Sequence, residues 1–226
     1  MVARALVNAR DEVAATEAMR SRREVLGRIR TALGPRPAVP DVPREYRQAG
    51  AADGGAADVV ELFCERVADY RAVVIRTTAD NLAAAIAAAC EARGSRRLIA
   101  APGVDWPVPG VEVKADGAGV AVAELDAASA LSGCALAIAE TGTIVLDGSP
   151  ACGRRALTLV PDHHVCVVRA DQVVAGVPDA IAALAPAARE GRPITFVSGP
   201  SATSDIELER VEGVHGPRKL DVIVVA

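Results

Sequence analysis

Four stretches in the second half of the chain place carboxylate, hydroxyl, imidazole or cationic side chains beside glycines, a combination that could do chemistry. In the first, Glu140, Thr141, Gly142 and Thr143 interrupt two strongly apolar runs. Burying an unpaired carboxylate costs several kcal/mol, so Glu140 is expected to face a polar cleft or a partner. Glu140 is therefore a candidate catalytic residue, and the three residues after it are candidate ligand-binding residues, since the glycine permits close backbone approach. A hairpin turn with a solvated carboxylate explains the same residues equally well.

The second stretch, residues 194–207, has the pattern of a strand, a loop rich in Gly, Ser and Thr, and the start of a helix. Ser204 and Glu207 form a capping-box pattern, and free amides at a helix N-terminus bind anions. The loop lacks the Walker and GxGxxG patterns. An ordinary capped loop is the alternative, although the hydroxyl residues exceed what one cap needs. The candidate ligand-binding residues here are Ser198, Gly199, Ser201, Thr203, Ser204 and Asp205.

The third stretch, residues 213–219, places one histidine and two cations between glycines and the last apolar run. His215 and Arg218 would complement a carboxylate or a phosphate if this turn lay near the preceding loop. A solvated basic turn is the alternative. We favour a ligand-binding role because the glycines hold the turn close to the domain.

The fourth stretch contains His163 and His164 after Pro161. Adjacent residues of an extended chain point to opposite faces, so at most one of the two histidines would bind a given metal. We expect no metal site, but a turn with one exposed and one hydrogen-bonded histidine. Nearby, Cys152 lies beside two arginines and could be an activated thiol. Without a located histidine partner, an inert cysteine is the favoured interpretation.

These stretches need a sheet to position them, and the apolar patterns predict one. Continuous apolar strands separated by helical windows in the first half indicate parallel strands buried on both faces. Short connections in the second half exclude crossover helices and require antiparallel pairs. The predicted helices cover residues 21–33, 58–69, 81–93, 127–131 and 178–189, with a short one from 205. The predicted strands cover residues 71–77, 97–101, 135–140, 143–147, 156–161, 165–169, 194–197 and 220–225.

The pattern therefore predicts an α/β fold with a mixed, mostly parallel sheet flanked by helices. We expect residues 1–55 to form an N-terminal helix and an extended connector, and residues 56–226 to form the α/β domain. A Ser21/Glu24 capping box begins the N-terminal helix, and Gly34 followed by Pro35 ends it. The helix therefore forms an extension to the main domain.

Composition excludes several classes of protein. The formal net charge is −4, the arginines are scattered, and aromatic residues make up 2% of the chain, which argues against nucleic-acid binding. No apolar run is long enough to span a membrane and no secretory leader is visible, so we expect a cytoplasmic protein. The five cysteines form no CxxC pair, which argues against a disulfide framework and a zinc ribbon.

The order of four motifs resembles the lactate utilization protein C family, also called the LUD-domain family. The motifs are ETGT at 140–143, PDHH at 161–164, SGPSATSDIE at 198–207 and GVHGP at 213–217, and RIRTALG at 28–34 is similar as well. The resemblance covers residues 21–226. It implies a fold like that of ribose-phosphate isomerase, glucosamine-phosphate deaminase and coenzyme A transferase. It also implies a bacterial three-protein system that oxidises L-lactate to pyruvate, with two cysteine-rich iron–sulfur partners.

Three hypotheses for the role of this component follow. In the leading one, the chain is an accessory subunit with an anion-binding cleft for a small carboxylate or a phosphorylated ligand. We expect it to lack a cofactor, because its scattered cysteines cannot ligate an iron–sulfur centre and it has no dinucleotide or flavin fingerprint. In the second, it is an independent enzyme with Glu140 as nucleophile or general base on an acyl or sugar-phosphate substrate. In the third, it is an adaptor that joins the iron–sulfur proteins through its N-terminal helix. The proposed cleft consists of Glu140, Thr141, Ser201, Thr203, Ser204, His215 and Arg218.

Overall fold

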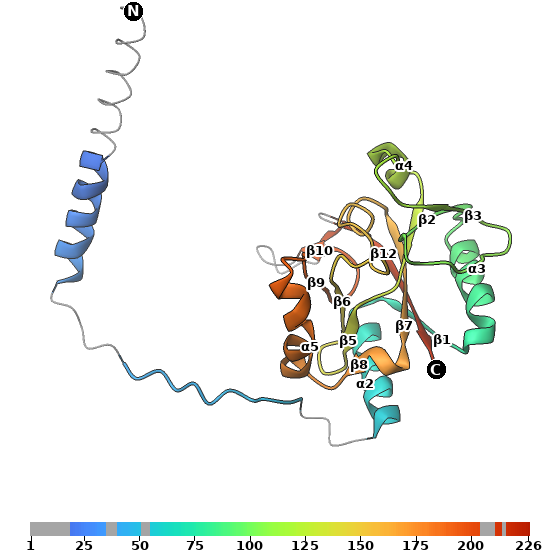
Figure 1. The fold of residues 1–226 in the computed structure, drawn as a ribbon, viewed down its shortest axis with the longest axis horizontal. Coiled ribbons are helices and arrows are strands. Elements are labelled where there is room, and N and C mark those ends of the chain that lie inside the picture. Colours follow the sequence, from blue (N-terminus) through green and yellow to red (C-terminus); the bar gives the residue numbers. More distant parts are fainter. Residues whose placement is uncertain (1–18, 35–39, 51–54, 204–210, 214–215) are drawn as a thin grey trace, which may run out of the picture. The chain divides into compact units, whose positions relative to one another are not determined.

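The computed structural model describes residues 19–34, 40–50, 55–203, 211–213 and 216–226 (Figure 1). Contacts divide the chain into two compact units, residues 1–45 and 46–226. In the smaller unit, residues 19–33 are helical, and the helix ends at Leu33 as predicted. The predicted capping box does not begin it, because Met19 and Arg20 are already helical and Ser21 lies inside the helix. The larger unit is the α/β domain.

A six-stranded, wholly parallel sheet forms the centre of the domain, in the order β1-β12-β7-β4-β2-β3. Helix α3 (Leu82–Ala92) covers one face, where Ile86 and Cys90 pack against strand side chains that include Leu131 and Ile223. The strands of this sheet are β1 (Val73–Thr77), β2 (Arg97–Ala100), β3 (Glu112–Ala115), β4 (Ser129–Ser132), β7 (His163–Arg169) and β12 (Lys219–Val225).

A second, four-stranded sheet lies on the other face, together with helix α2 (Ala56–Asp69). Its order is β8-β5-β6-β9, and it contains both antiparallel pairs and the parallel pair β5–β8. Helix α5 (Val177–Arg189) covers its outer face, so α3 and α5 lie on opposite sides of the domain (Figure 1). The strands are β5 (Leu136–Ile138), β6 (Thr143–Leu146), β8 (Val173–Val174) and β9 (Thr195–Val197).

Smaller elements complete the domain. Strands β10 (Ala202–Thr203) and β11 (Val211–Glu212) pair antiparallel just after β9. Helix α4 (Val122–Asp126) precedes β4, and 3-10 helices cover Ala79–Asn81 and Ala170–Gln172.

The α/β fold class is confirmed, and the mixed character comes from two sheets, one parallel and one mainly antiparallel. The predicted helix over residues 127–131 is wrong, because Ser129–Ser132 is strand β4, fully buried between β2 and β7. The predicted strand over residues 156–161 is also wrong. There, Val160 N–H donates to the carbonyl of Ala156, so the backbone forms turns while Leu157 is buried. The short helix predicted from residue 205 lies outside the described residues.

Candidate functional site

A cleft of about 390 Å³ opens where the loop after β9 meets the first residues of β7 and β12. Residues far apart in the sequence surround it: the turn after Arg154, the start of β7, the end of the second sheet and the approach to β12. Its lining residues are Arg155, Thr158, His164, Thr195 to Ala202, Gly216, Pro217 and Leu220.

His164 is the most deeply buried titratable side chain that lines this cleft. The Oγ of Ser132 donates to the carbonyl of Gly133 at 2.9 Å and lies 2.8 Å from Nε2 of His164. Assigning the single hydroxyl proton to the first bond, the shortest one in which Ser132 is the donor, places the ring proton on Nε2. Burial, with smaller contributions from His163 and Arg155, lowers the pKa of His164 to about 4. The ring is therefore neutral at pH 7, and Nδ1 is an acceptor without a hydrogen-bond partner among the described residues.

Arg155 supplies positive charge to the same cleft. Its Nη1 donates to the carbonyl and to the hydroxyl of Thr158, at 3.2 and 3.3 Å, which holds the exposed guanidinium in place. A guanidinium carries five N–H donors in a planar fork. Because these two bonds use one of its nitrogens, the group retains donors for a carboxylate or a phosphate.

The Ser198 loop is joined to the 140–143 turn by a chain of hydroxyl groups. Thr143 Oγ1 lies 2.8 Å from Ser198 Oγ and 2.7 Å from Thr141 Oγ1. The register of β6 and β9 causes this contact, since Ile144 pairs with Val197 and their neighbours follow. The structure thus brings together the first two predicted stretches.

Backbone bonds bring the third stretch to the same loop. Ser201 N–H donates to the carbonyl of Pro217 at 2.8 Å, and Gly213 N–H donates to the carbonyl of Ser201 at 2.9 Å. Thr203 lies in β10, opposite Val211. Ser204, Asp205 and His215 lie outside the described residues.

Two glycines of the predicted site contact protein rather than open space. Gly142 has a φ of +57°, and a Cβ there would lie 2.6 Å from the carbonyl carbon of Arg66. Gly199 has a φ of +82°, and its Cβ would lie 2.6 Å from Cβ of Tyr70. Both loops therefore need glycine, one to pack against the last turn of α2 and the other against Tyr70, the residue that follows this helix.

Glu140 and Arg218 have protein partners and are not among the described residues that line the cleft. Glu140 Oε1 accepts a bond of 2.8 Å from Arg47, while its Oε2 is buried without a partner among the described residues. Arg218 forms an ion pair with Asp162. The arginine that lines the cleft is thus Arg155, which sequence reasoning considered only as a neighbour of Cys152.

The two histidines differ from the sequence prediction, because both are buried. His163 lies on the α3 face of the sheet, where Nε2 is 3.1 Å from Asp221 Oδ2 and Nδ1 is 3.0 Å from Ser129 Oγ. Arg93 donates to the same carboxylate at 2.9 Å. The two histidines do face opposite ways, as β-strand geometry requires, and the described residues contain no group of three or more His, Cys, Asp or Glu side chains placed to hold a metal.

Cys152 is buried, and its Sγ lies 3.3 Å from Asp147 Oδ1. Burial raises the pKa of this thiol, which disfavours the reactive thiolate. All five cysteines are free and buried. Their burial agrees with the interpretation of inert, small apolar side chains.

Comparison with known proteins identifies the family. The family model for the LUD domain matches residues 45–225. The chain therefore belongs to the LUD domain family. A relative named Lactate utilization protein C, from Deinococcus radiodurans, is 51% identical to this LUD-domain chain over 172 residues, which is 75% of this chain and 80% of the relative. A protein of the same name from Shouchella clausii is 38% identical over 93 residues, 40% of each chain.

A solved structure supports the fold. The crystal structure of a DUF162 family protein from Deinococcus radiodurans superposes with a TM-score of 0.68 and 44% identity, and covers 76% of this LUD-domain chain and 99% of that chain. In the described part of the chain, no helix is both long and apolar enough to cross a bilayer.

Proposed function

We propose that this chain is a cytoplasmic component of a bacterial L-lactate utilization system and that its cleft binds a small carboxylate. Membership of the LUD domain family and the name of the 51% identical relative support the first part. The neutral His164 beside the cationic Arg155 carries the second part, because together they offer an acceptor and a positive charge at one cleft. Ser198 and Ser201 add hydroxyl groups to the same walls.

In this proposal the chain is a non-redox accessory subunit without a cofactor. Four of its five cysteines share one core cluster, but the described residues contain no group of three or more His, Cys, Asp or Glu side chains placed to hold a metal, as an iron–sulfur cluster would require. Electrons from lactate would pass through iron–sulfur partner proteins, and this chain would bind and orient an anionic ligand for the assembly.

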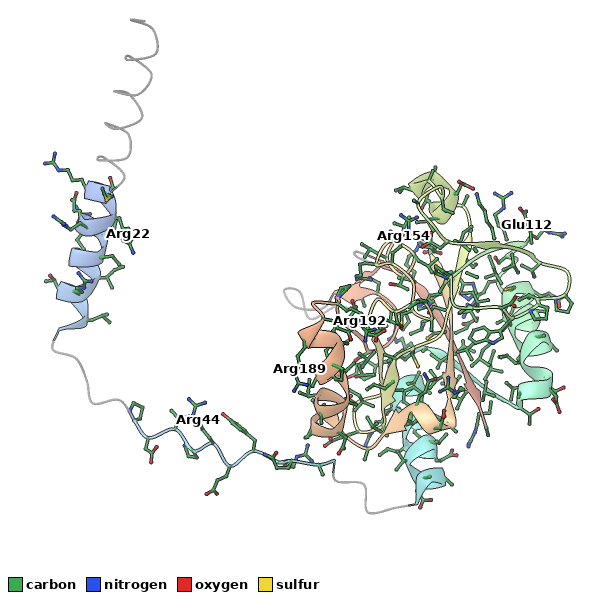
Figure 2. The ribbon with its side chains drawn as sticks, viewed as in Figure 1. Arg22, Arg44, Glu112, Arg154, Arg189 and Arg192 are labelled. Atoms are coloured by element: carbon green, nitrogen blue, oxygen red, sulfur yellow. The ribbon has the colours of Figure 1, made fainter. Side chains whose placement is uncertain are left out.

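The test is anaerobic, lactate-dependent dye reduction by the two iron–sulfur partners, with and without this chain. Arg155→Ala should lower the rate at least about tenfold, because the ligand would lose a charge-assisted bond. Arg189→Ala removes the same charge from the exposed surface of α5 and serves as the matched control (Figure 2). Equal rates with and without the chain would reject the accessory role, and equal rates for the two variants would reject the cleft.

A second candidate function is an independent acyl- or sugar-phosphate enzyme with Glu140 as nucleophile or general base. The observation that favours it is the buried Oε2, which has no partner among the described residues. A panel of acyl thioesters and sugar phosphates, assayed for turnover by the parent chain, would identify a substrate. Full turnover of that substrate by Glu140→Gln would exclude this role, whereas loss of turnover with unchanged stability would support it.

A further inference from the structure

The N-terminal helix, residues 19–33, exposes large apolar side chains. Met19, Val25, Ile29 and Leu33 are 69%, 54%, 47% and 71% exposed. The last three recur every four residues, so they form one stripe along the helix. Most helical stability in proteins comes from packing an amphipathic face, so an exposed aliphatic stripe favours binding of this helix to a further surface.

The same helix concentrates positive charge in a chain that is acidic as a whole. Residues 19–33 contain five arginines and one glutamate, which gives a formal charge of +4, whereas the whole chain carries −4. One of these arginines, Arg28, is paired with Glu24 at 2.9 Å. Arg22 projects from the helix in Figure 2.

Cationic and apolar groups lie side by side on this surface. Met19 and Leu26 share one shallow hollow with Arg22, Arg23 and Arg30. A surface that binds this helix must therefore present negative charges next to an apolar region along the whole length of the helix. The interface of an anionic bilayer does so, because phosphates lie directly above acyl chains, and guanidinium groups bind phosphate through two parallel bonds.

We infer that the N-terminal helix binds in the plane of an anionic lipid surface and anchors this chain there as a peripheral protein. The charge favours anionic over neutral lipid, and the stripe adds apolar burial that charge alone would not supply. This inference is independent of what the cleft binds.

The test is co-sedimentation of the full-length chain with vesicles. The chain should sediment with vesicles of phosphatidylcholine mixed with phosphatidylglycerol, but not with pure phosphatidylcholine, and salt should weaken the binding. Ile29→Asp should reduce the partition coefficient by about tenfold or more, because it puts a charge into the stripe. Thr31→Asp makes the same charge change on the opposite side of the helix and should reduce it only about threefold or less.

Three results would overturn the inference. The first is no sedimentation with either kind of vesicle. The second is an equal loss of binding in Ile29→Asp and Thr31→Asp, which would mean that the apolar stripe makes no contact with lipid. The third combines two observations: the parent chain binds no vesicles, and Ile29→Asp changes the oligomeric state measured by light scattering. Together they would assign the stripe to contact with a second copy of this chain.

Discussion

The protonation state of His164 determines what the cleft offers a ligand. A neutral ring with its proton on Nε2 donates to Ser132 and leaves Nδ1 as an acceptor on a side chain that lines the cleft. An imidazolium would have no such acceptor. The positive charge at the site must therefore come from Arg155, which lies close enough to lower the pKa of His164 further.

The depressed pKa of His164 predicts a pH dependence of stability. The unfolded chain binds a proton near pH 6.5, whereas the folded chain binds one only near pH 4, so stability should fall as pH decreases through this window. The full loss is on the order of 3 kcal/mol. Urea unfolding between pH 4 and pH 8 measures this loss of unfolding free energy. His164→Gln keeps the donor to Ser132 and should remove the part of the pH dependence that comes from His164. An unchanged pH profile in His164→Gln would contradict the assignment.

The buried carboxylate of Asp221 gives a second prediction at this scale. His163 and Arg93 both donate to it, and although burial opposes ionisation, their bonds lower the pKa of Asp221 below its ordinary value. Asp221→Asn should cost about 3 kcal/mol or more of unfolding free energy, because it removes one partner of a buried ion pair. Asp171→Asn disrupts the exposed pair with Arg169 and should cost less than about 1 kcal/mol. Similar losses in the two variants, measured by urea unfolding at pH 7, would contradict the structural role given to Asp221.

Sequence reasoning reached part of this site. The Ser198 loop, which lines the cleft, was identified because glycines and hydroxyl residues follow an apolar strand. The 140–143 turn was identified in the same way, but none of its residues lines the cleft, and among the described residues it is joined to the site only through the contact between Thr143 and Ser198. Arg155 and His164 were not assigned to a cleft, because their place in it depends on the approach of β7 to the second sheet. The sequence did contain an indication of the role of His164. Two histidines begin the apolar strand β7, and this pattern indicates buried imidazoles as readily as it indicates a turn.

At the scale of elements, helix α2 supports the two loops on one side of the candidate site. Gly142 holds the 140–143 turn against its last turn, and Gly199 holds the Ser198 loop against Tyr70, the residue that follows it. The two loops can then share the hydroxyl chain that links Thr141 to Ser198. The geometry of the cleft wall therefore depends on how closely both loops approach one helix.

Gly142→Ala tests this dependence. The added Cβ would have to move the turn off α2, and a residue other than glycine at a φ of +57° adds strain, so we expect a loss of about 2–3 kcal/mol. Gly191→Ala is the matched control, because Gly191 has a φ of +71° but open space around its Cβ position, which leaves a strain cost of about 1–2 kcal/mol. Thermal and urea unfolding report the stability difference. Equal losses in both variants would show that contact with α2 contributes nothing.

Whether an element could be predicted from the sequence depends on how far apart in the chain the residues that determine it lie. Helices α2, α3 and α5 and strands β1, β7 and β12 could be predicted from local periodicity. The division into two sheets could not, because pairing between β6 and β9 joins segments about fifty residues apart. Strand β3 was missed because all four of its residues are exposed at the sheet edge, so it lacks a buried pattern.

At the scale of the whole molecule, charge is distributed unevenly between the two units. Residues 1–45 hold nine of the 25 basic and six of the 29 acidic residues, so they carry +3 while residues 46–226 carry −7. The basic unit contains the proposed lipid-binding helix, and the acidic unit contains the cleft. Each proposed role can therefore be tested by variants in one unit alone.

The boundary between the units gives the last prediction. Sequence composition places it after residue 55, but Arg47 bonds to Glu140, and Gly50 N–H donates to Asp179 Oδ2 at 2.8 Å. The Gly50 bond to a carboxylate is worth about 1.5–3 kcal/mol and the exposed Arg47 pair at most about 1 kcal/mol. A chain that begins at Tyr46 should unfold at the same temperature as the parent α/β domain. A chain that begins at Ala56 should unfold several degrees lower, since each kcal/mol shifts the midpoint of a domain this size by about 2–4 °C. Equal midpoints for the two truncations would support the boundary at residue 55, because residues 46–50 would then add nothing to the stability of the domain.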